Sequence, residues 1–378
     1  MAALPVPDLH IPESSNTVNV SIIDTTTSIR GVDAWKFLEP SIPGHEYLAT
    51  LAFAFLIEHP KLDRSMVFDL GLRKDWWNCS PFLLDRFKKG GYVLNVEKSV
   101  REILEHGGFD ATKLEAIVWS HWHFDHTGSP AEFEKSTALI VGPCFKDNLL
   151  PGYPTDPNSS ILESDLEGRL LIELSFESGL KIGEFNAFDC FGDGSLYFLN
   201  SPGHAHGHIC ALARVTVDPA SFVLMGGDAW HHCGEIRPSP YMPLPDTIQP
   251  VPFTSLSSSS CPGALFEPIL RDGDPAKPIY KPSTQTKVQM HLDPEQAVRT
   301  IEKLQQADVQ ENILMVAAHD ESLLGIVEFF PKRANDFISK GWVKTARWKF
   351  LMDFAKAVGY EGEVVGRGDW SAPKEPQV

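Results

Sequence analysis

The sequence predicts an α/β fold in which strand ends carry the chemistry. Apolar segments of strand length alternate with amphipathic helical segments, as in 65–71, 97–106 and 114–120. Several of the apolar segments run directly into His or Asp residues, which indicates a site built where a sheet ends. Hydrophobic residues make up 43% of the chain and charged residues 22%, so a sizeable core is expected.

The length of 378 residues fits two average domains or one large domain with insertions. We expect one domain over 17–360, preceded by an extended arm over 1–16 and followed by a polar tail over 361–378. Loop-rich stretches at 146–168 and 231–290 are expected to be insertions, the first of them over one rim of the site.

The composition argues against several classes of partner. The net charge of −17 repels phosphate backbones and disfavours nucleic acid. No stretch reaches the roughly 18 apolar residues of a membrane-spanning helix, so no membrane insertion is expected. The first residues lack a basic region followed by an apolar one, and the six cysteines show no CxxC spacing. Both features predict a cytoplasmic protein with free thiols.

The first strands are expected to form a hairpin. Residues 18–24 alternate apolar and polar side chains and predict a strand, whereas 25–47 shows no regular pattern. The apolar run 48–58 predicts a strand buried on both faces, and 65–71 follows after a short turn. Asp69 ends this second strand, where it can cap the turn or support a site.

A β-α-β step is expected next. Helices are predicted over 79–88 and 97–106, the second ended by two glycines. The buried strand 114–120 follows, then a short helix over 131–133 and the strand 138–143.

The second half of the chain is richer in strands. Its patterns predict five strands, a long helix, a final strand and a closing helix, in the order 170–176, 185–191, 195–199, 208–214, 222–228, 294–306, 312–320 and 348–358.

The densest set of potential metal ligands is the run from His121 to His126. It lies on a tight turn after a buried strand, and such a turn can aim alternate side chains into one cavity. His121 and His123 can share one ion, while Asp125 and His126 point toward a second. Imidazole and carboxylate without any thiolate suit Zn²⁺. Pairs of His occur by chance, but four ligands within six residues favour a metal site.

Three further ligand types stand at strand ends: His204, Asp228 and His319. Each of them alone is more often structural than functional. Their joint placement points to one shared site with the first motif.

These motifs resemble those of the metallo-β-lactamase superfamily, and within it the lactonase-type hydrolases. In chain order they are Phe68-Asp69-Leu70-Gly71, His121-Trp122-His123-Phe124-Asp125-His126, Ser201-Pro202-Gly203-His204, Gly227-Asp228 and Ala318-His319-Asp320. The resemblance spans roughly residues 48–330. It implies an αββα sandwich, with two sheets face to face, helices outside and a dinuclear site at one edge.

The resemblance also implies two bound divalent metal ions, with Zn²⁺ as the expected metal. The first ion would be held by His121, His123 and His204, and the second by Asp125, His126 and His319. Asp228 would bridge the two ions, and Asp69 would support the site.

One position departs from the lactonase pattern. Those enzymes commonly carry a Tyr three residues after the bridging Asp, and this chain has His231 there, followed by His232. We expect a hydroxide shared by the two ions to attack the substrate carbonyl. His231 would stabilise the oxyanion, and Asp125 or a water would protonate the leaving group.

Six apolar or aromatic residues are expected to bind the substrate: Trp122, Phe124, Trp230, Tyr241, Met242 and Phe253. The insertion 231–290 starts three residues after Asp228, so it is expected to form the wall that selects a hydrophobic or aromatic acyl group. The alternative is a surface decoration that packs on its own domain.

The sequence leaves three functions open, all with a small-molecule partner. The first is a metal-dependent hydrolase that opens a lactone or another ester. The second is an acyl thioesterase acting on acyl-carrier-protein or coenzyme A esters, because the same metals would serve C–S cleavage. The third is a metal-bound binding module without turnover, whose signature would be a missing ligand, and none is missing here.

Overall fold

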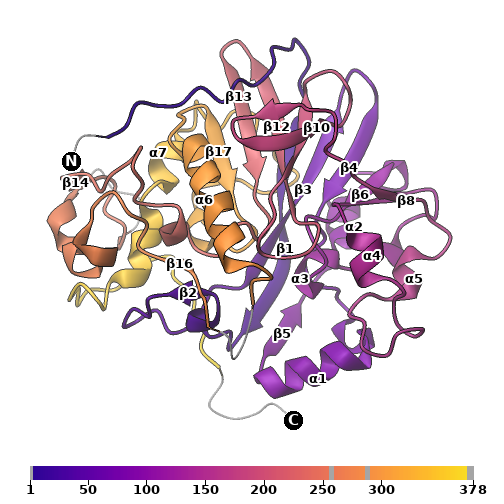
Figure 1. The fold of residues 1–378 in the computed structure, drawn as a ribbon, viewed down its shortest axis with the longest axis horizontal. Helices are drawn as coiled ribbons and strands as arrows, with labels where there is room; N and C mark the ends of the chain where they lie inside the picture. The colour runs from indigo at the N-terminus through magenta and orange to yellow at the C-terminus, as the bar shows by residue number, and fades with distance from the viewer. Residues whose placement is uncertain (1–2, 255–258, 286–289, 373–378) are drawn as a thin grey trace.

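The computed structural model describes residues 3–254, 259–285 and 290–372, and they form a sandwich of two sheets with helices outside (Figure 1). A core of apolar side chains from both sheets fills the space between them. A second apolar layer joins the outer face of one sheet to a long helix, and a third covers the outer face of the other sheet. This four-layer order confirms the αββα sandwich.

The first sheet has seven strands in the order β5-β1-β3-β4-β6-β7-β8. Their bounds are β1 Asn19–Arg30, β3 Leu51–His59, β4 Arg64–Phe68, β5 Val93–Val96, β6 Ala116–Val118, β7 Ala138–Val141 and β8 Leu171–Glu173. The pair β3–β4 is antiparallel and β6–β7 is parallel, as the hairpin and the β-α-β step required. β1 extends beyond the segment 18–24 that was predicted as a strand. The pattern of apolar and polar residues is lost there because polar threonines occupy the middle of the strand.

The second sheet has six strands in the order β17-β13-β12-β11-β10-β9. Their bounds are β9 Lys181–Ile182, β10 Phe185–Asp189, β11 Leu196–Asn200, β12 Ile209–Val217, β13 Ala220–Met225 and β17 Ile313–Val316. Two small ribbons pair β2 Leu38–Glu39 with β16 Lys281–Pro282 and β14 Thr247–Ile248 with β15 Cys261–Pro262.

The α-helices are α1 Pro81–Gly90, α2 Val100–His106, α3 Phe124–Thr127, α4 Phe145–Leu149, α5 Glu163–Leu166, α6 Pro294–Asp308 and α7 Trp342–Ala346. Asp293 caps α6 by accepting a hydrogen bond from the backbone N–H of Gln296 at 2.9 Å. The closing helix expected over 348–358 is instead a 3₁₀ helix over Lys349–Phe354 that follows α7. None of the helices in the described ranges is long and apolar enough to cross a bilayer.

Strand β3 shows why its apolar run is buried on both sides. Alternate side chains of a strand point to opposite faces. Phe53 and Phe55 therefore pack between the sheets, whereas Ala54 and Leu56 pack against the layer that contains α2.

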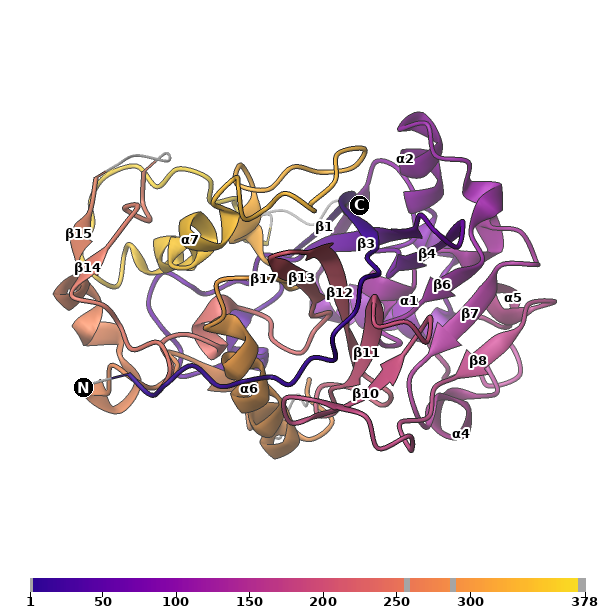
Figure 2. The same cartoon turned by 90° about the horizontal axis from the view of Figure 1, so that it is seen from above.

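The described parts of the N-terminal arm and of the C-terminal tail lie against the body. The arm over residues 3–16 runs along α6 (Figure 2). It is also tied to the second sheet, because the Arg214 guanidinium of β12 donates to the carbonyl of Pro12 at 2.5 Å. The described part of the tail is anchored by an ion pair of 2.9 Å between Arg367 and Asp353. The tail thus packs on the domain up to residue 372.

Candidate metal centre

The ends of five strands bring the expected site residues to one edge of the sandwich. β4 leads to Asp69, β6 to the 121–126 turn, β11 to His204, β13 to Asp228 and β17 to His319. β4 runs parallel to β6, and β13 parallel to β17, so each pair ends at the same edge.

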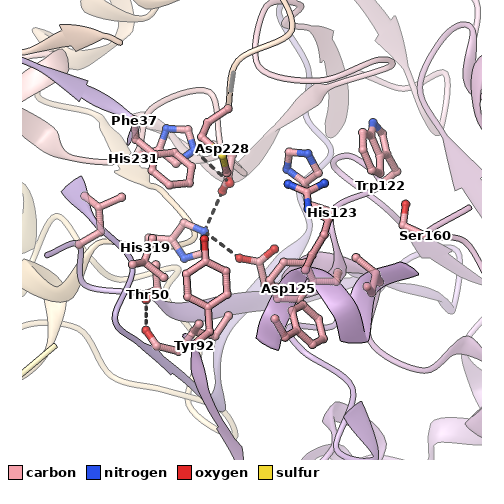
Figure 3. A pocket seen from close by; sticks show the side chains of 18 residues that line it. Phe37, Thr50, Tyr92, Trp122, His123, Asp125, Ser160, Asp228, His231 and His319 are labelled. Carbon is pink, nitrogen blue, oxygen red and sulfur yellow. Dashed lines mark hydrogen bonds and ion pairs between the residues drawn. The ribbon is translucent and has the colours of Figure 1, made fainter. Parts of the chain in front are cut away.

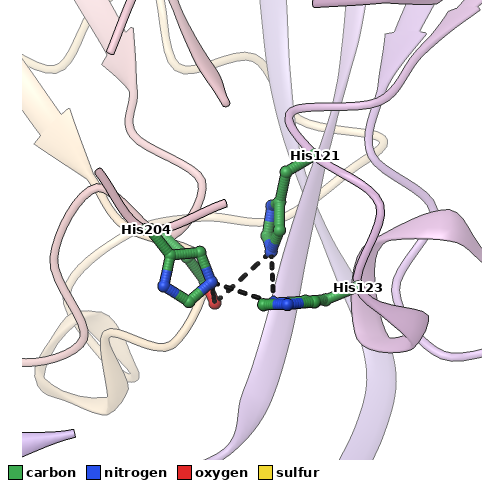
Figure 4. A group of neighbouring side chains, drawn as sticks. His121, His123 and His204 are labelled. Carbon is green, nitrogen blue, oxygen red and sulfur yellow. Dashed lines mark hydrogen bonds and ion pairs between the residues drawn. The ribbon is translucent and has the colours of Figure 1, made fainter. Parts of the chain in front are cut away.

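The first group of side chains consists of His121, His123, His204 and Asp228, whose ligand atoms all lie within 4.8 Å of one another. Nδ1 of His123 lies 2.9 Å from Nε2 of His121 and 2.9 Å from Nε2 of His204 (Figure 4). Three imidazole nitrogens thus converge on one point, as they do around a metal ion.

The second group consists of Asp125, His126 and His319, again with ligand atoms within 4.8 Å of one another. His319 Nε2 lies 3.6 Å from Asp125 Oδ2. Nδ1 of His319 donates a hydrogen bond to the carbonyl of Leu51, which leaves the lone pair on Nε2 and directs it into the site.

Asp228 lies between the two groups. Its Oδ2 is 3.8 Å from Nε2 of His121 and 3.6 Å from Nε2 of His204. Its Oδ1 is 3.0 Å from Nε2 of His126 and 3.2 Å from Nε2 of His319. One carboxylate oxygen therefore faces each group, as a bridging ligand requires.

The backbone around Asp228 is held in place by its neighbours. Its N–H donates to Nε2 of His208 at 3.0 Å. Gly227 has a φ of +52°, and a Cβ at this position would lie 2.8 Å from the side chain of Ser120. Both the backbone angle and the close approach require glycine here.

Asp69 supports the turn that carries the first motif. Its carboxylate accepts hydrogen bonds from the backbone N–H and the hydroxyl of Ser120, both at 2.7 Å, and pairs with Nδ1 of His126 at 2.9 Å. The contact with Nδ1 turns Nε2 of His126 toward Asp228. Asp69 itself is not a member of either ligand group.

The protonation states of the His residues follow from burial and neighbouring charges. Burial and the adjacent imidazoles hold the pKa of His121 and His204 well below the usual range, and burial lowers the pKa of His123 to about 3. These rings are neutral, which is the form that binds metals. Burial opposes charge on His126 and His319 as well, but the Asp228 carboxylate outweighs it and raises the pKa of both.

Two divalent cations fit this donor set. In each group, imidazole nitrogens and a carboxylate oxygen lie close enough to bind one ion. Asp228 reaches both groups. The positive charge of the ions would take the place of the protons that the carboxylates attract to His126 and His319.

A pocket that is partly open to solvent lies over the two groups (Figure 3). Its floor contains His123, Asp125, Asp228, His231 and His319. Its walls are mainly apolar and include Ile29, Val32, Phe37, Leu48, Leu83, Phe87, Tyr92, Trp122, Phe124 and Met290. Trp122 and Phe124, two of the residues proposed to bind substrate, are among the lining residues.

The other four residues expected to bind substrate do not line this pocket. Trp230 is buried in the apolar layer beside α6, with its ring against Gly226. Phe253 is buried in a separate core cluster and stacks on Tyr360 with ring centroids 4.3 Å apart.

The remaining two of these four lie in the same part of the molecule as Phe253. Met242 packs against that core cluster, and Tyr241 borders a different hollow on the surface. Among its described residues, the insertion 231–290 contributes only His231 and Met290 to the pocket lining. Its apolar side chains pack on the 3₁₀ helix Lys349–Phe354 instead, so the structure corrects the expectation of a substrate-selecting wall.

Other wall residues were not singled out from the sequence. Arg86 lies in α1 and Tyr92 just after it, and the helix predicted there gave no sign of a role in the pocket. Phe37 lies in the stretch that shows no regular pattern, and such a stretch carries no periodicity from which a pocket could be predicted. From the stretch 146–168, Ser160 is among the residues that line the pocket.

His231 lies on the pocket floor beside Asp228. Its Nε2 is 3.3 Å from Asp228 Oδ2, its ring centroid is 4.7 Å from that of Phe37, and its backbone N–H donates to Oε2 of Glu235 at 2.7 Å. His232 points away from the pocket, because its Nε2 pairs with Asp353 at 3.1 Å.

Comparison with known proteins identifies the family. The family model described as "Metallo-beta-lactamase superfamily" matches residues 52–260, more than half of the chain. The chain belongs to this superfamily. It is therefore a metallo-hydrolase of the metallo-β-lactamase superfamily, and the membership expected from its motifs is confirmed.

Relatives within the superfamily cover almost the whole chain. Gamma-lactamase FDB1 of Fusarium pseudograminearum is 47% identical over 354 residues, which are 92% of this chain and 85% of the relative. Metallo-hydrolase mfmC of Annulohypoxylon moriforme is 39% identical over 358 residues, which are 94% and 92% of the two chains.

A solved superfamily structure shares the fold. A mutant of AiiA from B. thuringiensis, determined with N-decanoyl-L-homoserine bound at its active site, matches with a TM-score of 0.55 and 17% identity. The match covers 84% of this chain and 99% of that one. At this identity the likeness supports the sandwich fold alone.

Proposed function

We propose that this superfamily member is a dinuclear metal-dependent hydrolase that opens a lactone or another ester. The observation that carries the proposal is the position of Asp228, with one carboxylate oxygen toward each of two ligand groups. A metal-bound binding module needs no such pairing of two sites.

The first ion would be held by His121, His123 and His204, the second by Asp125, His126 and His319, and both by Asp228. Zn²⁺ suits imidazole and carboxylate donors without thiolate. When bound, the two ions would supply a hydroxide nucleophile near neutral pH and polarise the substrate carbonyl.

The residues of the chain would orient the substrate and manage its protons. His231 lies where a ring N–H can donate to the developing oxyanion, next to Asp228. Asp125 lies on the pocket floor and would deliver a proton to the leaving atom as the ring opens. The apolar walls exclude water from around the reacting carbonyl.

The pocket walls favour a hydrophobic or aromatic substrate. Aromatic side chains from three segments, Phe37, Tyr92 and Trp122, border the space above the metal groups. Arg86 is the one Lys or Arg among the lining residues that the structure describes. A largely neutral cyclic ester with an aromatic or aliphatic body fits this lining.

A second candidate substrate is a five-membered lactam. The Fusarium relative that is 47% identical carries the name gamma-lactamase. The same nucleophile and oxyanion donor would serve an amide carbonyl, but the amine leaves less readily than an alkoxide and depends more on proton delivery.

The experiment is a substrate panel of lactones, γ-lactams, linear esters and acyl thioesters, measured with the zinc-loaded protein. We expect the cyclic substrates with an apolar body to show the highest kcat/KM, and chelation to abolish the activity. A preference for acyl-carrier-protein or coenzyme A thioesters would favour the thioesterase alternative instead. No turnover on any member of the panel would contradict the proposal.

Asp228→Ala tests the site within the same panel. We expect kcat to fall by about 10³-fold or more and the protein to lose at least one metal ion per chain, while it stays folded. Asp147→Ala on the exposed face of α4 is the matched control and should leave both unchanged. Near-normal turnover of the Asp228 variant would refute the bridging assignment.

A further inference from the structure

Arg367 lies in the C-terminal tail, far along the chain from the candidate ligands, but its side chain reaches into the domain. Its Nε pairs with Oδ1 of Asp353 at 2.9 Å, and its Nη2 donates to the carbonyl of Gly44 at 2.7 Å. Asp353 is 7% exposed and belongs to the 3₁₀ helix Lys349–Phe354. A guanidinium with two partners is held firmly, because its donors form a rigid planar fork. The tail is thus joined to the interior by a buried carboxylate.

The other oxygen of Asp353 faces His232. Nε2 of His232 donates to Oδ2 of Asp353 at 3.1 Å, since Nδ1 of the same ring accepts from the backbone N–H of Gly234 at 2.9 Å. Burial alone would raise the pKa of Asp353, but the hydrogen bond from His232 and the nearby charge of Arg367 oppose it, and the pKa falls to about 2. The carboxylate is therefore ionised and connects Arg367 with His232.

His232 in turn fixes the turn that follows the candidate oxyanion donor. By accepting from Gly234, its ring caps the 3₁₀ helix Cys233–Glu235. Glu235 ends this helix, is 1% exposed, and accepts from the backbone N–H of His231 at 2.7 Å. His231 is therefore bonded to His232 along the chain and to Glu235 by a hydrogen bond, so its position depends on this one turn.

The same tail meets the metal centre at a second point. Oε1 of Glu321 accepts from the backbone N–H of Gly368 and from Nε1–H of Trp370, the latter at 3.0 Å. Glu321 begins the 3₁₀ helix Glu321–Leu323, and its own N–H donates to the carbonyl of His319 at 3.1 Å. The tail thus also contacts the segment after a candidate ligand, and zinc content can report on that second contact.

We propose that Arg367 and Asp353 are positioning residues that hold His231 in place through His232. The proposal rests on the oxyanion-donor role proposed for His231. The relay consists of three polar contacts of 2.9, 3.1 and 2.9 Å, and both Asp353 and His232 are buried, so water competes little for them. A small displacement of a group that acts on the reacting atoms lowers the rate more than it weakens substrate binding.

The first test compares kcat, KM and zinc content of the wild type, Arg367→Met and Arg367→Lys. We expect kcat of the Met variant to fall by about 10-fold, with KM and zinc content nearly unchanged, because Met keeps the stem but loses the charge and the donors. Lys keeps the charge toward Asp353 and should restore most of kcat. Arg333→Met is the matched control, because exposed Arg333 pairs only with Glu58, at 3.4 Å, and it should leave all three quantities unchanged.

A double-mutant cycle separates positioning from general support of the fold. Once His231→Phe has removed the donor, there is nothing left for Arg367 to position, so adding Arg367→Met should change kcat by less than about 2-fold. The same fold-loss in both backgrounds would overturn the proposal, and so would full kcat in Arg367→Met alone. Loss of zinc from that variant would place its effect on the ligands, which also overturns it.

A further readout uses the wild type and depends on neither activity nor the folding of a variant. In ¹⁵N-labelled protein the ring of His232 should be neutral, with its proton on Nε2. A proton on Nδ1 would overturn the relay, because that nitrogen could then not accept from Gly234. If the wild type turns over no member of the substrate panel, the proposed function fails, whereas the tautomer of His232 still tests the relay.

Discussion

At the scale of single residues, the side chain that most separates this chain from the lactonase pattern is His231. It lies on the pocket floor, with Nε2 beside the carboxylate that faces both ligand groups. A buried Glu235 accepts from its backbone N–H and so fixes the position of its main chain. The ring is thus held where a donor to the substrate oxyanion is needed.

His231→Phe tests this role. We expect kcat to fall by about 10²–10³-fold, the usual effect of removing one oxyanion donor, with zinc content unchanged. His106→Phe, at the exposed end of α2, is the control. Steady-state kinetics with metal analysis decides the matter, and a variant with full kcat would remove His231 from the reaction.

Most of the candidate metal ligands could be found from the sequence because each follows an apolar strand. Asp228 and His319 come directly after the buried β13 and β17, and the strand pattern predicted their place. Phe37 could not be found in this way. It lies in a stretch without periodicity, and only the folded chain brings it to the pocket.

At the scale of elements, α1 and the turn that leads from it to β5 form one wall of the pocket. α1 is capped by Ser80 and ended by Gly91, whose φ of +66° turns the chain back toward the site. Tyr92 follows this turn and lines the pocket, as do Leu83 and Phe87 of α1. The insertion 231–290 was the predicted wall, but its apolar residues are used in its own core cluster.

Tyr92→Ala should therefore lower kcat/KM selectively. For a lactone or ester with a bulky aromatic body we expect a loss of about 10-fold, the effect of removing part of an aromatic contact, and little change for a small generic ester. Tyr241→Ala is the matched control, because Tyr241 borders a different hollow. Equal losses for both substrates, or a selective loss in the control, would show that this wall does not choose the substrate.

The regular elements were easier to predict than the irregular ones for a physical reason. α6 has a capping Asp, a proline at its start and one buried face, so its sequence alone indicates a helix. The 3₁₀ helix Lys349–Phe354 is buried nearly all round, and an apolar run of that kind does not distinguish helix types. The packing of two sheets was predicted from the resemblance of the motifs to those of a known family, and no single segment indicated it.

At the scale of the whole molecule, a chain of net charge −17 buries some of its carboxylates, and burial without a compensating partner makes a carboxylate costly to ionise. Asp165 on α5 is a clear case, because it is 4% exposed and its Oδ1 has no partner among the described residues. Burial raises its pKa to about 6, against the opposing effect of Arg73, whose Nη1 lies 3.7 Å from Oδ2.

The last prediction concerns the pH dependence of stability that follows from Asp165. An acid whose pKa is higher in the folded state than in the unfolded chain favours the folded state least when it is ionised in both. The free energy of unfolding should therefore carry a penalty that appears as the pH rises above the ordinary Asp pKa of 3.8 and is complete above about 6. Asp165→Asn removes this penalty. The free energy of unfolding of the variant should therefore rise relative to that of the wild type over that pH range, and stay roughly 3 kcal/mol higher at higher pH. Urea unfolding of both proteins at several pH values measures the difference, with the exposed Asp147→Asn as a control that should show none. An advantage that stays constant across the range, or one that shrinks as the pH rises, would contradict the burial of an ionisable Asp165.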